Sequence, residues 1–362
     1  MKKVIYQLLY FSLLVIASLT VIALTAQAVL APQTKIIAET NQLTLPIEKV
    51  IEPEIPNTVT TTLIFGGDVM LSRTVNRKSK AYTDYTWPMS QIASTTALAD
   101  LFIINLESPF TNGGNYNVPT GSFSFNADPN SLEALLISGV DVVSLANNHT
   151  INQGKKGIED TIKLLTENDI AFTGTGLNEA QARQPAIVEK NGLTFGFLGY
   201  AYPNDYSVAT EKRHGIANMD SKKMIADVAI LKTKVDVVIV MIHAGHEYVN
   251  RPNQQQITFA KSAIDAGADI IIGHHPHWVQ NIEIYNNKPI LYSLGNLVFD
   301  QIWSKETQEG ALAEVTFKDK EIEKIKIIPT IIKDYGQVEL ADKIISERVL
   351  KRMGLKTNEI KL

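Results

Sequence analysis

The chain has 362 residues, of which 45% are hydrophobic and 20% charged, which fits a globular protein of one large or two modest domains that also carries a membrane segment. Its formal net charge of −4 gives no electrostatic basis for binding nucleic acid. The absence of cysteine excludes disulfide bonds, thiolate catalysis and cysteine-ligated zinc, and it suits an oxidising location outside the cytoplasm.

The N-terminus carries a long apolar segment. Lys2 and Lys3 precede a stretch from Val4 to Ala31 without a charged residue. A membrane-spanning helix needs about 20 apolar residues, so residues 1–31 are predicted to be an uncleaved membrane anchor. Ala26-Gln27-Ala28 matches a signal-peptidase site, so a signal cleaved after its last alanine is the alternative. The two lysines predict a single-pass protein of the cell membrane with a cytoplasmic N-terminus and an extracytoplasmic main domain.

The next segment differs in composition from the rest of the chain. Residues 32–60 contain Pro, Thr, Glu and Gln without clear periodicity, and Pro46, Pro53 and Pro56 would break a helix. We predict an extracytoplasmic stalk here. Apolar runs recur from residue 61, so we assign residues 61–335 to the main domain and residues 336–362 to a C-terminal helix and tail.

Short apolar runs that end in polar clusters predict the strands of the main domain. These runs are Thr62–Phe65, Leu101–Ile104, Val140–Leu145, Val235–Ile242, Ala268–Ile272 and Pro289–Tyr292. Helices are expected over Gly157–Asn168 and Gln254–Ala266, where apolar residues recur with a helical period. Strands alternating with helices predict an α/β fold with largely parallel pairing. Leu312–Phe317 and Ile322–Ile332 are expected to form a hairpin or meander, and Ala341–Met353 a final surface helix.

Three histidines lie within the five residues Gly273-His274-His275-Pro276-His277, directly after a predicted strand. Glycine and proline end the strand there, which places the histidines at the sheet edge where ligands bind in open α/β folds. Three buried imidazoles would each need hydrogen-bond partners, so metal or phosphate chemistry explains them better than core packing. His214 is expected on a surface loop, and His246 is the weakest site candidate. The histidines that follow predicted strands are His149, His243, His246, His274, His275 and His277.

Oxygen ligands follow three other predicted strands. Asp68, Glu107 and Asn148 offer carboxylate and amide oxygens, which complement imidazole around hard or borderline metal ions. Each has a structural alternative, since Asp68 could shape a turn, Glu107 could pair with an arginine, and Asn147 or Asn148 could cap a helix. Together they predict a metal site, with Glu107 as a candidate bridging ligand, of the kind that activates water and binds a phosphoryl group.

The combination of motifs resembles the CapA/PgsA family of capsule and poly-γ-glutamate synthesis proteins, a divergent branch of the calcineurin-like metallophosphoesterases. The resemblance runs from about Leu63 to Ile332. His243-Ala244-Gly245-His246-Glu247-Tyr248 is similar to the family's His-Trp-Gly-x-Glu-Tyr, with Ala244 where tryptophan is usual. The other motifs are Gly67-Asp68-Val69-Met70, Asn105-Leu106-Glu107, Ser144-Leu145-Ala146-Asn147-Asn148-His149, Gly273-His274-His275-Pro276-His277 and Ser293-Leu294-Gly295-Asn296.

The resemblance implies a calcineurin-like four-layer αββα sandwich, here preceded by the N-terminal transmembrane helix, with up to two divalent metal ions that could be Mn, Zn, Fe or Mg. The ligands of the first ion would be Asp68, Glu107 and His277. The ligands of the second would be Glu107, Asn148, His243 and His275. His149 would be the catalytic residue, protonating the leaving group or stabilising the substrate oxyanion. The residues implied to contact substrate or support the ligands are Asn147, Glu247, His274 and Asn296.

The chain also departs from the parent superfamily at the first metal position. Met70 stands where that superfamily has a histidine, and Glu107 replaces its usual aspartate. Methionine is a poor ligand for hard cations, so phosphatase activity does not follow directly from the resemblance.

The family implies a membrane-anchored component of capsule or poly-γ-glutamate biosynthesis or export, with a metal-dependent, hydrolase-like domain outside the membrane. Its implied partners are the membrane, a Mur-ligase-like ATPase and a small multi-span membrane protein of the polymer synthase. An anionic polymer or a phosphate-bearing molecule would be the substrate, and no nucleic acid is expected. Two alternatives stay open: an active metal-dependent phosphoesterase with an extracytoplasmic substrate, and a non-catalytic assembly subunit.

Overall fold

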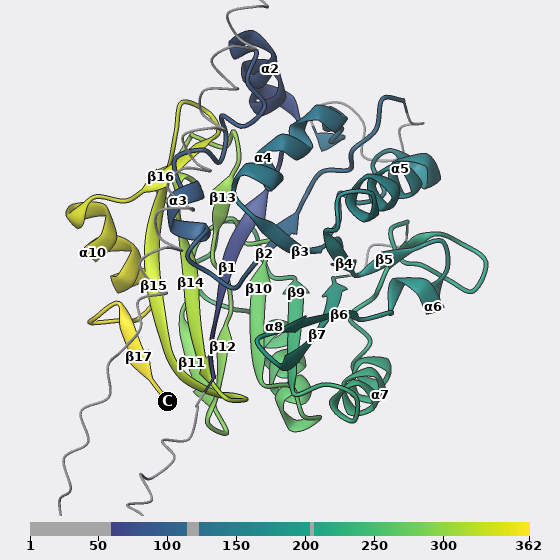
Figure 1. Ribbon diagram of the computed structural model, residues 1–362, viewed down its shortest axis with the longest axis vertical. Coiled ribbons are helices and arrows are strands. Elements are labelled where there is room, and N and C mark those ends of the chain that lie inside the picture. Colours follow the sequence, from purple (N-terminus) through teal and green to yellow (C-terminus); the bar gives the residue numbers. More distant parts are fainter. Residues whose placement is uncertain (1–58, 114–122, 203–205) are drawn as a thin grey trace, which may run out of the picture. The chain divides into compact units, whose positions relative to one another are not determined.

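The computed structural model describes residues 59–113, 123–202 and 206–362 (Figure 1). The chain divides into two units, Met1–Pro56 and Asn57–Leu362, and the described residues belong to the second. The predicted membrane anchor and nearly all of the predicted stalk therefore lie outside the described residues. Within the described ranges, no helix is long and apolar enough to cross a membrane.

Two sheets with parallel central strands form the centre of the second unit. The larger sheet runs in the order β16 (Gln337–Leu340), β15 (Glu321–Lys333), β14 (Glu309–Lys318), β1 (Thr60–Val69), β2 (Leu101–Leu106), β3 (Val140–Ser144), β4 (Ala171–Thr173). In addition, β13 (Asn296–Val298) pairs with β1, and β17 (Glu359–Lys361) pairs with β15. The smaller sheet runs in the order β11 (Ile282–Tyr285), β12 (Lys288–Leu291), β10 (Ile270–His274), β9 (Val237–His243), β7 (Leu193–Ala201), β6 (Ala186–Lys190).

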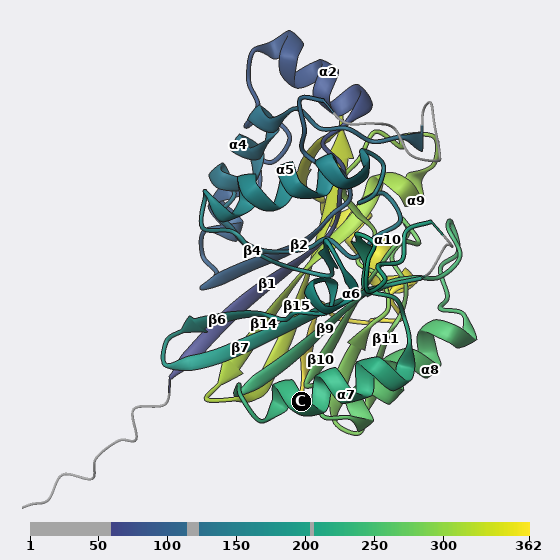
Figure 2. The same ribbon diagram turned by 90° about the vertical axis from the view of Figure 1, so that its right-hand side faces the viewer.

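Helices cover the outer faces of both sheets, so the unit has four layers (Figure 2). The helices α4 (Leu132–Ile137) and α5 (Gly154–Thr166) pack on the larger sheet, and α2 (Arg73–Tyr82) follows β1. On the smaller sheet lie α7 (Ser221–Lys232) and α8 (Gln254–Asp265). The layers therefore follow the order helices, larger sheet, smaller sheet, helices.

The central strands are apolar on both faces because each face is covered. In β9, Val237, Ile239 and Met241 pack between the two sheets, while Val238 and Val240 alternate with them and pack beneath α7 and α8. A strand buried on both sides therefore has no polar face, which is typical of parallel sheets. This burial explains why the predicted strands are continuous apolar runs in the sequence.

The α/β fold class predicted from the sequence is confirmed. The six predicted strands correspond to β1, β2, β3, β9, β10 and β12, and the two predicted helices to α5 and α8. The predicted hairpin is the antiparallel pair β14 and β15. Residues 336–362 contribute β16, α10 (Lys343–Arg352) and β17 to the same unit, and Val349 of α10 is buried in the core between the sheets.

The sequence patterns did not predict β7, which lies beside β9 in the smaller sheet. Two glycines interrupt its apolar run, and both allow close contacts. A Cβ atom at Gly196 would lie 2.9 Å from the side chain of Leu231 in α7, and one at Gly199 would lie 3.0 Å from Ser144 Oγ in β3. Glycine in a strand interior marks such close approaches and weakens the strand signal.

Candidate metal centre

The carboxyl ends of parallel strands from both sheets meet at the candidate site. From the larger sheet, β1 supplies Asp68, and the segments after β2 and β3 supply Glu107 and Asn148. From the smaller sheet, β9 supplies His243, and the segment at the end of β10 supplies His274, His275 and His277. Among the predicted ligands, the oxygen donors thus come from the larger sheet and the imidazoles from the smaller one.

Close packing of backbone places Asp68 at this edge. A Cβ atom at Gly67 would lie 1.9 Å from the carbonyl oxygen of Gly295, so only glycine fits there. The Asp68 N–H donates to that same oxygen at 3.0 Å, and Asp68 pairs in register with Asn296 of β13. The paired glycines before Asp68 therefore allow the chain near Asn296 to lie directly against β1.

The carboxylate of Asp68 is fully buried and surrounded by donors. It accepts hydrogen bonds from Asn105 Nδ2 at 2.8 Å and from the backbone N–H of His275 at 3.2 Å. Burial raises the pKa of Asp68, but contacts with His274 and His277 outweigh burial and hold the pKa well below its usual value. Asp68 is therefore a carboxylate in the folded protein, the form that binds cations.

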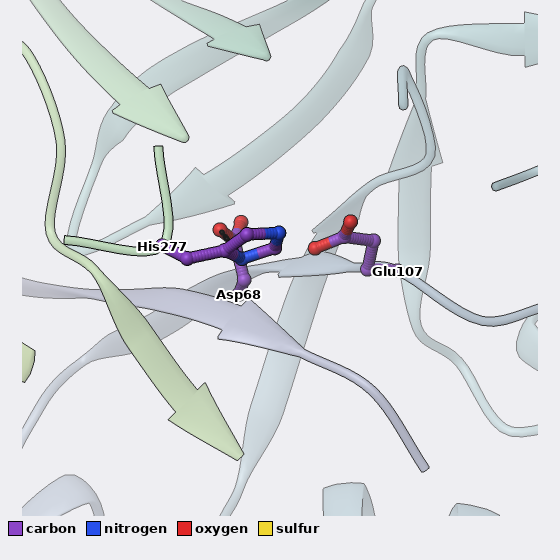
Figure 3. Close-up of side chains that lie close together, drawn as sticks. All are labelled: Asp68, Glu107 and His277. Carbon is purple, nitrogen blue, oxygen red and sulfur yellow. Dashed lines mark ion pairs between the residues drawn. The ribbon is translucent and has the colours of Figure 1, made fainter. Parts of the chain in front are cut away.

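Asp68, Glu107 and His277 form a buried group that could hold a metal ion (Figure 3). Their ligand atoms all lie within 4.8 Å of one another. Both carboxylate oxygens of Glu107 are buried without a hydrogen-bond partner among the described residues. Burial, followed by the negative charges of Asp68 and Glu247, raises the pKa of Glu107 well above its usual value. A buried acid without partners needs an explanation, and a cation between these side chains would supply one.

A second group of ligand atoms lies around His243 Nε2. This atom is 2.9 Å from Asn148 Oδ1, 3.1 Å from His275 Nδ1 and 3.9 Å from Glu107 Oε1. Two ligands bound to one ion at about 2.1 Å lie about 3.0–3.4 Å apart in octahedral or tetrahedral geometry, so the shorter distances match ligand edges. Burial lowers the pKa of His243 well below its usual value and that of His275 to about 4. Both imidazoles are therefore neutral, as metal binding requires.

The ring of His149 lies at the side of the centre and has a defined tautomer. Its Nδ1 is 2.9 Å from Asn152 Oδ1, an oxygen that also accepts the backbone N–H of Phe125 at 2.8 Å. Because that oxygen is an acceptor, Nδ1 carries the proton, and Nε2, 3.7 Å from Glu107 Oε1, is the basic atom. Burial lowers the pKa of His149 to about 3. In this state His149 presents a proton acceptor to the centre, and its role as a proton donor stays a prediction.

The predicted supporting residues occupy different environments. Asn147 joins two strand ends, because its amide donates to Leu106 O at 2.8 Å and accepts the N–H of His149 at 3.1 Å. His274 is buried, with Nδ1 3.5 Å from Asp68 Oδ1 and neither ring nitrogen hydrogen-bonded. Glu247, like His246, is exposed at the rim. Thus Asn147 and His274 lie behind the ligands, and Glu247 lies at the solvent side.

Two residues near the centre were missed by the sequence analysis. Asn105 donates to Asp68 and lies 3.2 Å from His243 Nδ1, so it joins the two sheets. Its only signal was its place in the motif Asn105-Leu106-Glu107. Arg73 forms an ion pair with Asp300, and its guanidinium carbon lies 4.8 Å from the ring centre of Phe125, which stacks on His149 at 3.8 Å. Met70 packs in the core beneath the helices and supplies no ligand.

The fold and the buried carboxylate–histidine group define an α/β protein with a candidate metal centre. The family model for bacterial capsule synthesis protein PGA_cap matches residues 62–301. The chain belongs to this family of capsule and poly-γ-glutamate biosynthesis proteins. The predicted family membership is thereby confirmed.

Similar proteins include two from Bacillus. The capsule biosynthesis protein CapA of Bacillus anthracis is 30% identical, and the match covers 82% of this chain and 74% of that protein. The PGA biosynthesis protein CapA of Bacillus subtilis strain 168 is 31% identical, with 73% of this chain and 70% of that protein covered. A solved structure of a hypothetical protein from Thermus thermophilus matches with a TM-score of 0.47 and 15% identity over 74% of this chain and 98% of that one.

Proposed function

We propose that this protein is a component of capsule or poly-γ-glutamate biosynthesis or export whose main domain carries a two-metal, hydrolase-like centre. Glu107 carries this proposal, because its buried carboxylate has no hydrogen-bond partner among the described residues and lies between the two groups of ligand atoms. A shared carboxylate of this kind is typical of dinuclear hydrolytic sites. The order of the four layers also supports a calcineurin-like metallophosphoesterase fold.

The residues have distinct roles in the proposed centre. Asp68, Glu107 and His277 would hold one ion, and Glu107, Asn148, His243 and His275 the other. When bound, such ions lower the pKa of water and offset negative charge on the reacting group. Asn105 fixes the Asp68 carboxylate through its 2.8 Å hydrogen bond. His149, with Nε2 basic and Nδ1 held by Asn152, can accept a proton from water or return one to a leaving group.

Loss of one proposed ligand tests the function directly. His275→Ala is expected to lower Mn²⁺ affinity by about 100-fold or more, since even groups that only support ligands are worth about 10–100-fold. The same substitution is expected to reduce polymer production in cells that depend on this protein. Calorimetric titration with Mn²⁺ and quantification of surface polymer check both results.

His246→Ala is the matched control, since His246 is exposed on the neighbouring loop and is not among the proposed ligands. If His275→Ala lost Mn²⁺ binding but kept full polymer production, catalysis by this centre would be contradicted. The non-catalytic assembly subunit would then be the remaining alternative. Hydrolysis of a generic phosphodiester by the Mn²⁺-loaded protein, abolished by His275→Ala, would favour the phosphoesterase alternative. The shared position of Glu107 is the observation that favours that alternative.

We also propose that the main domain lies outside the cell membrane, next to the polymer synthase subunits implied by the family. The uncharged stretch Val4–Ala31, which follows Lys2 and Lys3 in the sequence, supports this orientation. A reporter enzyme that is active only outside the cytoplasm, fused after Leu362, is expected to be active. A reporter that is active only inside the cytoplasm serves as the reciprocal control, and activity of that fusion would contradict the orientation.

A further inference from the structure

Two aromatic side chains extend from the candidate metal centre into solvent. The Tyr248 ring stacks near the His277 ring, with centres 5.9 Å apart and planes 27° apart. Trp303 packs edge-on against Tyr248, with ring centres 4.6 Å apart. Trp303 is 59% exposed although it is one of the largest apolar side chains. Tyr248 and Trp303, called the aromatic wall below, thus begin at a proposed metal ligand and end at the surface.

A chain of amides ties the aromatic wall to His277. Gln301 Nε2 donates to the Tyr248 hydroxyl at 3.2 Å, and Gln301 Oε1 accepts from Asn296 Nδ2 at 3.2 Å. Asn296 Oδ1 is 2.9 Å from His277 Nδ1. The wall and the proposed ligand are therefore held by one continuous network.

This network also determines the tautomer of His277. Asn296 Nδ2 donates to the carbonyl oxygen of Thr307 at 2.9 Å, and a carbonyl can only accept. The amide oxygen of Asn296 must therefore face His277, whose Nδ1 carries the proton. Nε2 of His277 is left with its lone pair for a metal ion. The orientation of the ligand and the position of the wall are thus fixed together.

The backbone indicates that this arrangement is imposed by its surroundings. Tyr248 and His277 both have left-handed φ angles, of 62° and 58°. Such a conformation is unfavourable for a bulky residue and persists where neighbouring contacts enforce it, commonly at functional sites. The Tyr248 N–H donates to Pro276 O at 2.9 Å, which anchors its loop to the histidine segment.

We propose that the aromatic wall binds a flat face of the substrate, a ring or an amide plane, directly beside the oxyanion held at the metal centre, so that Trp303 determines specificity. This inference rests on the proposed metal centre. The centre offers charge and polar atoms, whereas the wall offers flat apolar surface next to it. Exposed indole rings of this kind contribute a large share of binding energy where a ligand covers them.

Two phosphonates separate the contribution of the wall from that of the metal centre. Phenylphosphonate and methylphosphonate share the oxyanion, but only the first carries a flat ring. The full-length protein loaded with Mn²⁺ is titrated with each probe by calorimetry. Trp303→Ala is expected to weaken phenylphosphonate binding roughly 3–10-fold, the range for one aromatic contact, and to leave methylphosphonate binding unchanged.

Matched variants complete the test. Trp303→Phe is expected to retain most of the phenylphosphonate affinity, and Tyr335→Ala, which removes an exposed aromatic residue in the turn between β15 and β16, is expected to change neither affinity. Equal effects of Trp303→Ala on both probes, or no effect on either, would overturn the role of the wall. Failure of the unsubstituted protein to bind Mn²⁺ would instead overturn the proposed metal centre, whereas Mn²⁺ binding without binding of either phosphonate would overturn the role of the wall.

Discussion

Replacement of Glu107 by glutamine is expected to stabilise the metal-free protein and to abolish its stabilisation by metal ions. The pKa of Glu107 is raised mainly by burial, so the folded state retains a proton that the unfolded state has lost. The stability of the unsubstituted protein should therefore fall as pH rises from about 4.5, the unfolded value, through the raised folded pKa. Glu107→Gln removes this loss of stability, so we expect it to raise the free energy of unfolding of the metal-free protein by about 1–3 kcal/mol at pH 7.

Urea denaturation in EDTA and in Mn²⁺, repeated between pH 4 and pH 8, measures both effects. At a Mn²⁺ concentration of 100 times Kd, the unsubstituted protein should gain about 2.7 kcal/mol, and Glu107→Gln should gain little. Glu189→Gln, which changes an exposed carboxylate in β6, is the control and should leave both quantities unchanged. Equal stabilisation of Glu107→Gln and the unsubstituted protein by Mn²⁺ would show that Glu107 is not a ligand.

Asp68→Asn is expected to have the opposite effect on the metal-free protein. Burial alone would raise the pKa of Asp68, but its contacts with His274 and His277 lower it, so the folded state prefers the carboxylate. This contribution is present above the unfolded pKa and is lost as pH falls through the folded pKa. An asparagine amide would place donor against donor at Asn105 or at the His275 N–H, at a cost of about 3–5 kcal/mol.

The free energy of unfolding in EDTA at pH 7 checks this prediction. Asp100→Asn is a matched control, because Asp100 also accepts a backbone N–H, that of Thr62 at 2.8 Å, but at the opposite end of β1 from Asp68. That change should cost about 1 kcal/mol, a typical single hydrogen bond. A cost for Asp68→Asn no larger than for Asp100→Asn would show that the imidazoles do not stabilise the Asp68 carboxylate.

The sequence predicted the parts of the fold that local patterns encode. The strands that bear the proposed ligands are buried on both faces, so they were visible as apolar runs. The strand β7 is equally central but was not predicted, because the glycines that allow its close contacts with other layers interrupt its apolar run. The residues of the predicted first group, Asp68, Glu107 and His277, do lie together in the structure.

The surroundings of the site could not be predicted in the same way. Asn296 lies next to Asp68 because β13 pairs with β1, and residues so far apart in the sequence carry no local sign of that pairing. His275 and His277 have left-handed φ angles of 95° and 58°, so the alternation of a strand does not give the directions of their side chains. The aromatic wall depends on both features, since its amide chain starts at Asn296 and its rings stack from His277.

The division of donors between the sheets has a consequence for how the centre forms. Among the proposed ligands, the oxygen donors lie on the larger sheet and the imidazoles on the smaller one, so neither half of the molecule holds a complete set of ligands. A bound ion would act as a cross-link between the two halves. The affinity of the protein for that ion would therefore depend on how the two sheets pack against each other. Substitutions in the core between the sheets, far from any ligand, would then change metal affinity by changing how the sheets pack.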